Sequence, residues 1–256
     1  MCVNYTPTRH EKLAYFARTG KDLDDYWPET WQDYQAPIVK LDQEREREVV
    51  LASYGMVPQN HLPEGVRFST MNARLETIAE KRSYARAWRL AQRCLVPMSA
   101  FFEPNYESGK AERWRIGVKA EGEHAAYPSD TATQAEFAVA GLYHSWQDPQ
   151  GQMQFSFTQI TINADQHPLM QRFHKPGDEK RSLVILPPEH YDDWLSDQQQ
   201  EFARALLTLY PALNMWAEPA PLQRASKTKA TNRKTGPAST AADEADTNPA
   251  QQASLF

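Results

Sequence analysis

Strand-forming segments that follow one another along the chain constrain its fold most. Residues 155–164 alternate Phe155 and Phe157 with Ser156 and Thr158, and a period of two is typical of a strand whose two faces differ. Because such segments cluster instead of alternating strictly with helices, we predict an α+β fold with a mostly antiparallel, barrel-like sheet and flanking helices. The other predicted strands span residues 49–54, 93–102, 113–119, 137–146 and 182–186.

Helices are predicted at residues 78–92, 188–195 and 198–209. Within the first, Tyr84 and Trp88 share one face and are expected to pack on the core. Another face carries a row of arginines, which is either a solvated face paired with acids such as Glu80 or a ridge that binds DNA phosphates. The scarcity of interleaved acids favours the ridge. The row consists of Arg82, Arg86, Arg89 and Arg93.

The last part of the sequence differs sharply in composition from the rest. Residues 223–254 contain no Leu, Ile, Val, Met, Phe, Tyr or Trp. Such a segment buries too little apolar area to offset the entropy of ordering. We therefore predict a domain at 1–222 and a disordered tail at 223–256.

The tail ends in an apolar pair that could anchor it to a partner. Gln252, Leu255 and Phe256 resemble the bacterial peptide that binds the DNA polymerase sliding clamp. Leu255 and Phe256 are the only large apolar residues in the tail, and an apolar pair on a tether suits a hydrophobic pocket. The alternative is a chance apolar ending.

The composition limits which cellular compartment and which binding partners we expect. The net charge is −5, yet residues 71–93 carry six basic and two acidic side chains, so a local basic surface is compatible with DNA binding. With only Cys2 and Cys94 there is no disulfide framework, and no apolar run reaches about 20 residues. We expect a cytoplasmic, nucleoid-associated protein with no membrane partner, no metal and no cofactor, in which Cys94 is a buried thiol.

Cys2 directly follows the initiator methionine. If Met1 is removed, Cys2 presents an α-amine and a thiol on adjacent carbons, with ordinary pKa values near 8 and 8.5. Such an aminothiol reacts with an aldehyde to form an imine and then a five-membered thiazolidine ring. Without supporting acid–base groups, a cysteine at this position is an accident of sequence.

Four ordered segments supply those groups, and with them the chain resembles the SRAP family (SOS response-associated peptidase), whose members process abasic sites. The resemblance covers essentially all of residues 1–222, and it rests on the combination because no single motif is specific. The segments are Met1-Cys2, Asn72-Ala73-Arg74-Leu75-Glu76-Thr77, Ser99-Ala100-Phe101-Phe102-Glu103, and Ile162-Asn163-Ala164-Asp165 followed by Pro168-Leu169-Met170 and Phe173-His174.

The resemblance implies a role for each matching residue. Cys2 would crosslink to the aldehyde of an abasic site in single-stranded DNA, and Asn72 would orient the reacting groups. Glu103 would serve as a general base for the α-amine or as its electrostatic partner. His174 would move a proton at the sugar ring oxygen, which helps the cyclic sugar open. Arg74 would contact a phosphate beside the lesion.

Two departures from the family pattern affect DNA binding. The family begins Cys-Gly-Arg, whereas this chain begins Cys2-Val3-Asn4, so the helical arginine row or Arg9 would have to supply the missing phosphate contact. The turn after His174 is also longer than usual, and Arg181 is expected to replace a basic residue there as a DNA contact.

Competing residues and functions stay open at this point. His167 competes with His174, and Glu76 competes with Glu103. The leading hypothesis is a thiazolidine crosslink that protects the lesion, with possible abasic lyase chemistry. The alternatives are a cysteine peptidase or autopeptidase that uses Cys2, an N-terminal-nucleophile amidohydrolase, and a module that only binds DNA or the clamp.

Overall fold

A computed structural model describes residues 3–17, 23–120, 134–196 and 199–222. Cys2 and the predicted clamp-binding residues Gln252, Leu255 and Phe256 lie outside the described residues. The domain boundary at 222 and the disordered tail therefore stay predictions.

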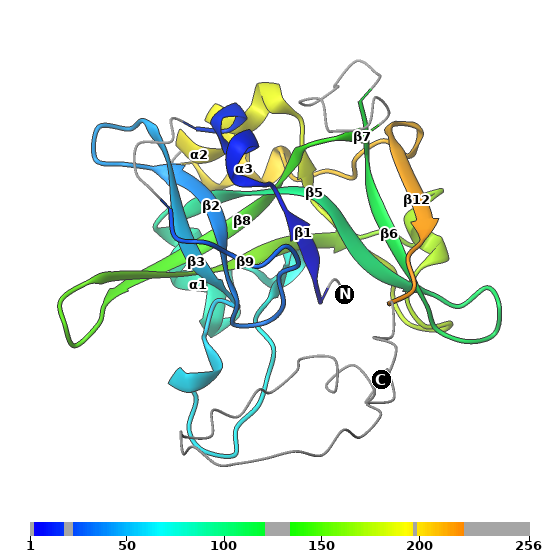
Figure 1. Cartoon of the computed structure of the whole chain (residues 1–256), viewed down its shortest axis with the longest axis horizontal. Coiled ribbons are helices and arrows are strands. Elements are labelled where there is room, and N and C mark those ends of the chain that lie inside the picture. Colours follow the sequence, from blue (N-terminus) through cyan, green and yellow to red (C-terminus); the bar gives the residue numbers. More distant parts are fainter. Residues whose placement is uncertain (1–2, 18–22, 121–133, 197–198, 223–256) are drawn as a thin grey trace, which may run out of the picture. The chain divides into compact units, whose positions relative to one another are not determined.

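A closed five-stranded barrel forms the centre of the fold (Figure 1). The strands close in the order β8–β9–β3–β2–β5, and β5 pairs again with β8. Within the barrel all pairs are antiparallel except β3–β9. The predicted α+β class with a barrel-like, mostly antiparallel sheet is confirmed. The barrel strands are β2 (Gln35–Leu41), β3 (Arg47–Tyr54), β5 (Arg93–Asn105), β8 (Phe137–Gln147) and β9 (Met153–Asn163).

Shorter strands extend this sheet. Strands β1 and β6 pair with β5, strands β4 and β10 pair with β9, and strand β11 pairs with β8. Short segments therefore lie along several sides of the barrel. Strands β1, β2, β4, β7 and β12 were not predicted. The additional strands are β1 (Tyr5–Pro7), β4 (Asn72–Arg74), β6 (Glu112–Lys119), β7 (Gln134–Ala135), β10 (Arg181–Leu183), β11 (Ile185–Leu186) and β12 (Met215–Pro219).

The helices are shorter than predicted. None of those in the described ranges combines the length and apolar character that a membrane span requires. Three are α-helical: α1 (Arg82–Arg89), α2 (Tyr191–Ser196) and α3 (Gln200–Ala205). The short 3-10 helices are η1 (His10–Tyr15), η2 (Gln59–His61), η3 (Leu75–Thr77), η4 (Met170–Arg172), η5 (Pro188–His190) and η6 (Ala212–Asn214).

The predicted arginine row loses its last member. Ala91 has a φ of 50°, a left-handed conformation that ends the helical period after α1. Arg93 therefore begins β5 instead of extending the row, and it is 2% exposed. Its guanidinium lies 5.7 Å from the Trp88 ring centre and 5.1 Å from that of Trp194. The prediction that Arg93 lies on the exposed basic face is wrong.

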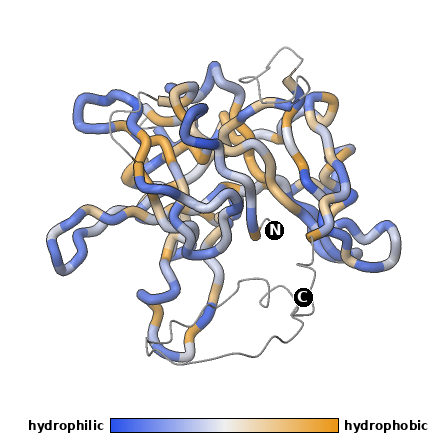
Figure 2. Tube along the Cα trace, in the orientation of Figure 1, coloured by the Kyte–Doolittle hydropathy of each residue, from blue (hydrophilic) through white to orange (hydrophobic). Residues whose placement is uncertain are grey.

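The barrel strands bury both faces. On β5, Val96 belongs to the apolar cluster inside the barrel, whereas Leu95 packs with Trp88 and Trp194 under the helices. Figure 2 shows apolar residues concentrated along the central strands and hydrophilic residues in the outlying loops. Cys94 is fully buried, as predicted, and burial raises the pKa of its thiol. Because apolar residues pack against both faces of the barrel strands, the strand ends that carry the site are held in place.

Candidate active site

Strand β1 directs the N-terminal end of the chain along β5. Tyr5 is in register with Phe101, and the Phe102 backbone N–H donates to the Asn4 carbonyl at 3.2 Å. Because the pairing is antiparallel, the chain runs from Tyr5 back toward the Glu103 end of β5. Val3, the first described residue, packs against the apolar cluster inside the barrel.

Glu103 and His174 form a buried acid–base pair. Glu103 is 3% exposed and His174 is 7% exposed, and His174 Nε2 lies 3.2 Å from Glu103 Oε2. At this distance the two groups form an ion pair when the imidazole is protonated, and a carboxylate beside an imidazole is an arrangement suited to acid–base chemistry. The structure therefore brings together two of the predicted catalytic residues from positions far apart in the sequence.

Local backbone contacts fix His174 beside the end of β5. Phe173 forms an antiparallel bridge with Asn105, and the His174 N–H donates to the Pro104 carbonyl at 2.9 Å. The Phe173 ring is fully buried and meets Trp114 edge to face, with ring centres 6.0 Å apart. His174 itself has a φ of 66°, which is uncommon for a residue other than glycine. Residues with such backbone conformations occur most often at functional sites.

The competing histidine has a structural role. His167 Nε2 lies 2.8 Å from the Tyr210 carbonyl, so this nitrogen carries the proton. Its Nδ1 accepts the backbone N–H groups of Leu169 at 3.2 Å and Met170 at 2.9 Å. Both ring nitrogens are thus committed to holding the chain, which supports the choice of His174 over His167.

Asn72 lies on β4, a strand that pairs with β9 in parallel, and its backbone is in register with Gln159. The Asn72 carbonyl accepts the Tyr84 hydroxyl at 3.2 Å, which ties β4 to α1. Gln159, which was not predicted as a site residue, is fully buried and accepts the Tyr54 hydroxyl at 3.0 Å. Tyr54 in turn meets Tyr5 of β1 edge to face at 5.4 Å. The sequence did contain a signal for the burial of Gln159, because this residue lies two positions after Phe157 and therefore on the same face of the strand.

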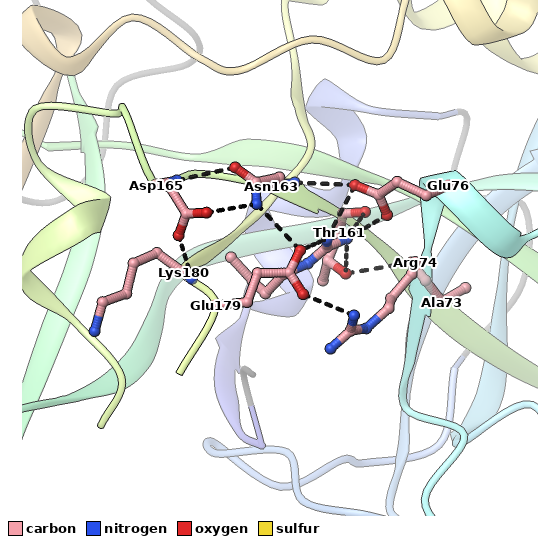
Figure 3. Close-up of polar contacts among 9 residues, drawn as sticks. Ala73, Arg74, Glu76, Thr161, Asn163, Asp165, Glu179 and Lys180 are labelled. Atoms are coloured by element: carbon pink, nitrogen blue, oxygen red, sulfur yellow. Dashed lines mark hydrogen bonds and ion pairs between the residues drawn. The ribbon is translucent and has the colours of Figure 1, made fainter. Parts of the chain in front are cut away.

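Arg181 is the centre of an ion-pair network, and its partners Glu76, Glu179 and Thr161 are labelled in Figure 3. Its side chain is 2% exposed. It donates to both oxygens of Glu76 at 2.9 Å, to Glu179 at 2.7 Å, and to the Thr161 carbonyl at 2.7 Å. Burial acts to raise the pKa of the Glu76 carboxyl, but the hydrogen bonds and charge of Arg181, together with the backbone N–H groups of Glu76 and Asn163, lower it below its ordinary value. In the free protein Arg181 thus binds two carboxylates and a carbonyl, and its predicted contact with DNA stays a prediction.

Arg74 lies at the edge of the same network. Its side chain is 47% exposed, and its Nη1 donates to Glu179 Oε2 at 2.7 Å. The arginines of α1, namely Arg82, Arg86 and Arg89, are exposed, whereas Tyr84 and Trp88 of the same helix are buried as predicted. Whether these arginines contact DNA stays a prediction.

Solved structures with this fold are known. An X-ray crystal structure of a protein from Bordetella bronchiseptica has a TM-score of 0.72 and 31% identity, and the similarity covers 86% of this chain and 100% of that one. A second, from Bacteroides thetaiotaomicron, has a TM-score of 0.63 and 22% identity, with 85% and 91% covered. The second likeness concerns the fold alone.

Curated proteins are also similar in sequence. The abasic site processing protein YoqW of Bacillus subtilis is 29% identical over 167 residues, which cover 64% of this chain and 65% of YoqW. The abasic site processing protein HMCES of Xenopus tropicalis is 24% identical over 182 residues, which cover 68% of this chain and 52% of HMCES. The matches thus span less than two thirds of these relatives' own length.

The family comparison covers the whole region in which the barrel and the buried pair lie. The family model described as SOS response associated peptidase (SRAP) matches residues 1–222. This match exceeds half of the chain and includes the segments that carry Glu103, His174 and the Arg181 network. The chain belongs to the SOS response associated peptidase family.

Proposed function

We propose that this protein processes abasic sites in single-stranded DNA by forming a covalent crosslink through Cys2 after Met1 has been removed. The buried Glu103–His174 pair is the observation that carries the proposal, because β1 leads the N-terminal end of the chain toward it. Relatives named abasic site processing proteins add independent support.

The chemistry of the crosslink balances without a cofactor. His174 moves a proton at the ring oxygen of the cyclic sugar, so that the ring opens to the aldehyde. The neutral α-amine of Cys2 adds to the aldehyde carbon, and loss of one water gives an imine, with Glu103 accepting the amine proton. The Cys2 thiolate then adds to the imine carbon, and a proton returns to the nitrogen to give the thiazolidine.

This site requires an acid and a base that are held apart from bulk water. A positioned acid–base group contributes on the order of 10²–10⁴-fold to a rate. Glu103 and His174 are both buried, and neighbouring backbone bonds hold His174 in one place. Asn72, on β4, would orient the opened sugar or the N-terminal residue.

A denaturing gel tests the crosslink. A single-stranded oligonucleotide with one uracil is treated with uracil glycosylase and mixed with the protein. The wild type should give a heat-stable shifted band that is absent in Cys2→Ala and retained in Cys94→Ala, the matched control at the only other cysteine in the sequence. Cys2→Ser keeps the amine, so it should give a link that needs borohydride trapping to survive heat. A heat-stable band in Cys2→Ala contradicts the proposal.

The family name includes the word peptidase, and the same groups could also cleave the DNA strand as a lyase. Strand cleavage at the lesion would follow if the imine persisted before thiolate addition. We therefore expect Cys2→Ser, which lacks the thiol, to cleave abasic strands more than the wild type does. Peptidase action is proposed only for removal of Met1.

We also propose that Gln252, Leu255 and Phe256 bind the sliding clamp. The support is the sequence pattern, since an apolar pair follows a long polar segment. Deletion of Leu255 and Phe256 should abolish binding to immobilised clamp while crosslinking stays unchanged. Clamp binding that survives the deletion would contradict this assignment.

A further inference from the structure

Three donors converge on the carboxylate of Glu179, and two of them, Arg74 and Asn163, are labelled in Figure 3. Arg74 Nη1 donates to Oε2 at 2.7 Å, and Arg181 Nη1 donates to Oε1 at 2.7 Å. The side-chain amide of Asn163 donates to the same Oε1 at 3.1 Å. Two guanidinium groups and an amide around one anion resemble the donor set that proteins present to a phosphate.

Two of these donors are held in place without Glu179. Glu76 holds Arg181 through both of its oxygens, and the Thr161 carbonyl accepts another of its N–H groups. The Asn163 amide donates to Asp165 at 2.9 Å, and its backbone N–H donates to Glu76 at 3.2 Å. Arg181 and Asn163 would therefore stay in place if the Glu179 carboxylate moved away.

Glu179 itself is able to leave. Its side chain is 34% exposed, and it lies on the exposed turn that follows His174. The turn is anchored beside it, because the Lys180 N–H donates to Asp165 at 2.8 Å and the Ala164 N–H donates to the Lys180 carbonyl at 2.8 Å. Release of the carboxylate thus needs only a side-chain rotation. The hydrogen bond from Arg181 lowers the pKa of Glu179, so it is ionised at neutral pH.

We propose that Arg74, Arg181 and Asn163 form an anion site for a backbone phosphate of the DNA strand, and that Glu179 occupies this site in the free protein. A strand that binds must displace the carboxylate. Glu179 is therefore an internal competitor that weakens the binding of any single strand. This inference rests on the proposed function, because it places the strand beside the turn that carries His174.

Binding of an undamaged strand tests the site without the crosslink. Fluorescence anisotropy with a labelled oligothymidine should show Glu179→Gln binding about two- to fivefold more tightly than the wild type, which is the fold-change expected for the loss of an exposed ion pair. The slope of log affinity against log salt should stay nearly the same in both proteins, because the wild type makes the same phosphate contact once the Glu179 carboxylate has been displaced. Equal or weaker binding by Glu179→Gln overturns the inference.

Two matched variants separate a local effect from a change in net charge. Asp192→Asn removes the same charge from another arginine–carboxylate pair, Arg47–Asp192 at 2.7 Å, and should leave affinity unchanged. In an Arg74→Gln background, Glu179→Gln should give a smaller gain, because one of the three donors is missing. A gain that also appears in Asp192→Asn, or that is undiminished without Arg74, would show that the site is not formed by these residues.

The two proposals fail separately. If the wild type crosslinks an abasic strand but Glu179→Gln binds an undamaged strand no better, only the anion site is rejected. If the wild type forms no crosslink, the proposed function is rejected, whatever Glu179→Gln does to binding.

Discussion

Replacing Arg181 by Met should destabilise the folded protein strongly. Methionine has a similar length and is apolar, so it can fill the buried space, but it donates nothing. The substitution removes every hydrogen bond that Arg181 makes to Glu76, Glu179 and Thr161. Three segments, η3, β9 and the turn after His174, would lose their common partner.

The magnitude follows from burial. Removing one partner of a buried ion pair costs about 3–5 kcal/mol in the free energy of unfolding. Glu76 and Glu179 are 47% and 34% exposed, so water can solvate them in the variant, and we expect the lower part of that range. At about 2–4 °C per kcal/mol for a domain of this size, the melting temperature should fall by roughly 6–16 °C.

The stability lost in Arg181→Met should decrease as the pH falls. The pKa values of Glu76 and Glu179 are lowered from an ordinary value of 4.5 by their bonds to Arg181. A carboxyl with a lowered pKa contributes stability that is present above its ordinary pKa and is lost as the pH falls through the lowered value. The gap between the wild type and Arg181→Met is therefore complete near pH 7 and shrinks below about pH 4.5. The bond to the Thr161 carbonyl leaves a residual gap of about 1–3 kcal/mol.

Thermal unfolding followed by circular dichroism from pH 3 to 7 measures this gap. Arg172→Met is the control, since Arg172 makes a comparable two-bond pair with Glu107 at 2.9 Å on the surface and should cost at most about 1 kcal/mol. If the Arg181→Met gap were no larger than the control, or did not change with pH, the network would not contribute to stability in the way described.

Two further predictions concern the site and the barrel. Glu103→Gln preserves shape but removes the base beside His174, so the initial rate of crosslinking on time-resolved gels should fall by about 10²-fold or more; an unchanged rate would exclude Glu103 as the base. Gly141→Ala should lower the free energy of unfolding in urea by about 1–3 kcal/mol, because an added Cβ would lie 2.8 Å from both Cys94 Sγ and the Thr158 carbonyl; wild-type stability would mean that β5, β8 and β9 pack less closely than described.

The sequence predicted those parts of the fold that have a local period. Strands β5, β8 and β9 are long and rich in apolar or alternating residues, and all three were expected. Strand β2 was missed because Pro37 interrupts its pattern and because it buries residues on both faces. Barrel closure depends on a parallel pairing between Tyr54 and Phe157, a long-range contact that leaves no local signal.

The site was predictable as a set of residues but not as an arrangement. The resemblance to the family identified Glu103 and His174, while their contact depends on Phe173 bridging to Asn105 at the end of β5. Arg181 follows a polar turn, so its sequence context suggested an exposed side chain. Its burial comes from partners on three separate segments, which no pattern along the chain could indicate.

Mass spectrometry of the crosslinked product tests the central claim most directly. The protein is incubated with an abasic oligonucleotide, digested with nuclease and trypsin, and the modified peptide is sequenced. We predict that the sugar remnant is attached to a peptide that begins at Cys2 and lacks Met1, with both the α-amine and the thiol blocked. A remnant on a lysine or on Cys94, or a modified N-terminal peptide that retains Met1, would contradict the account.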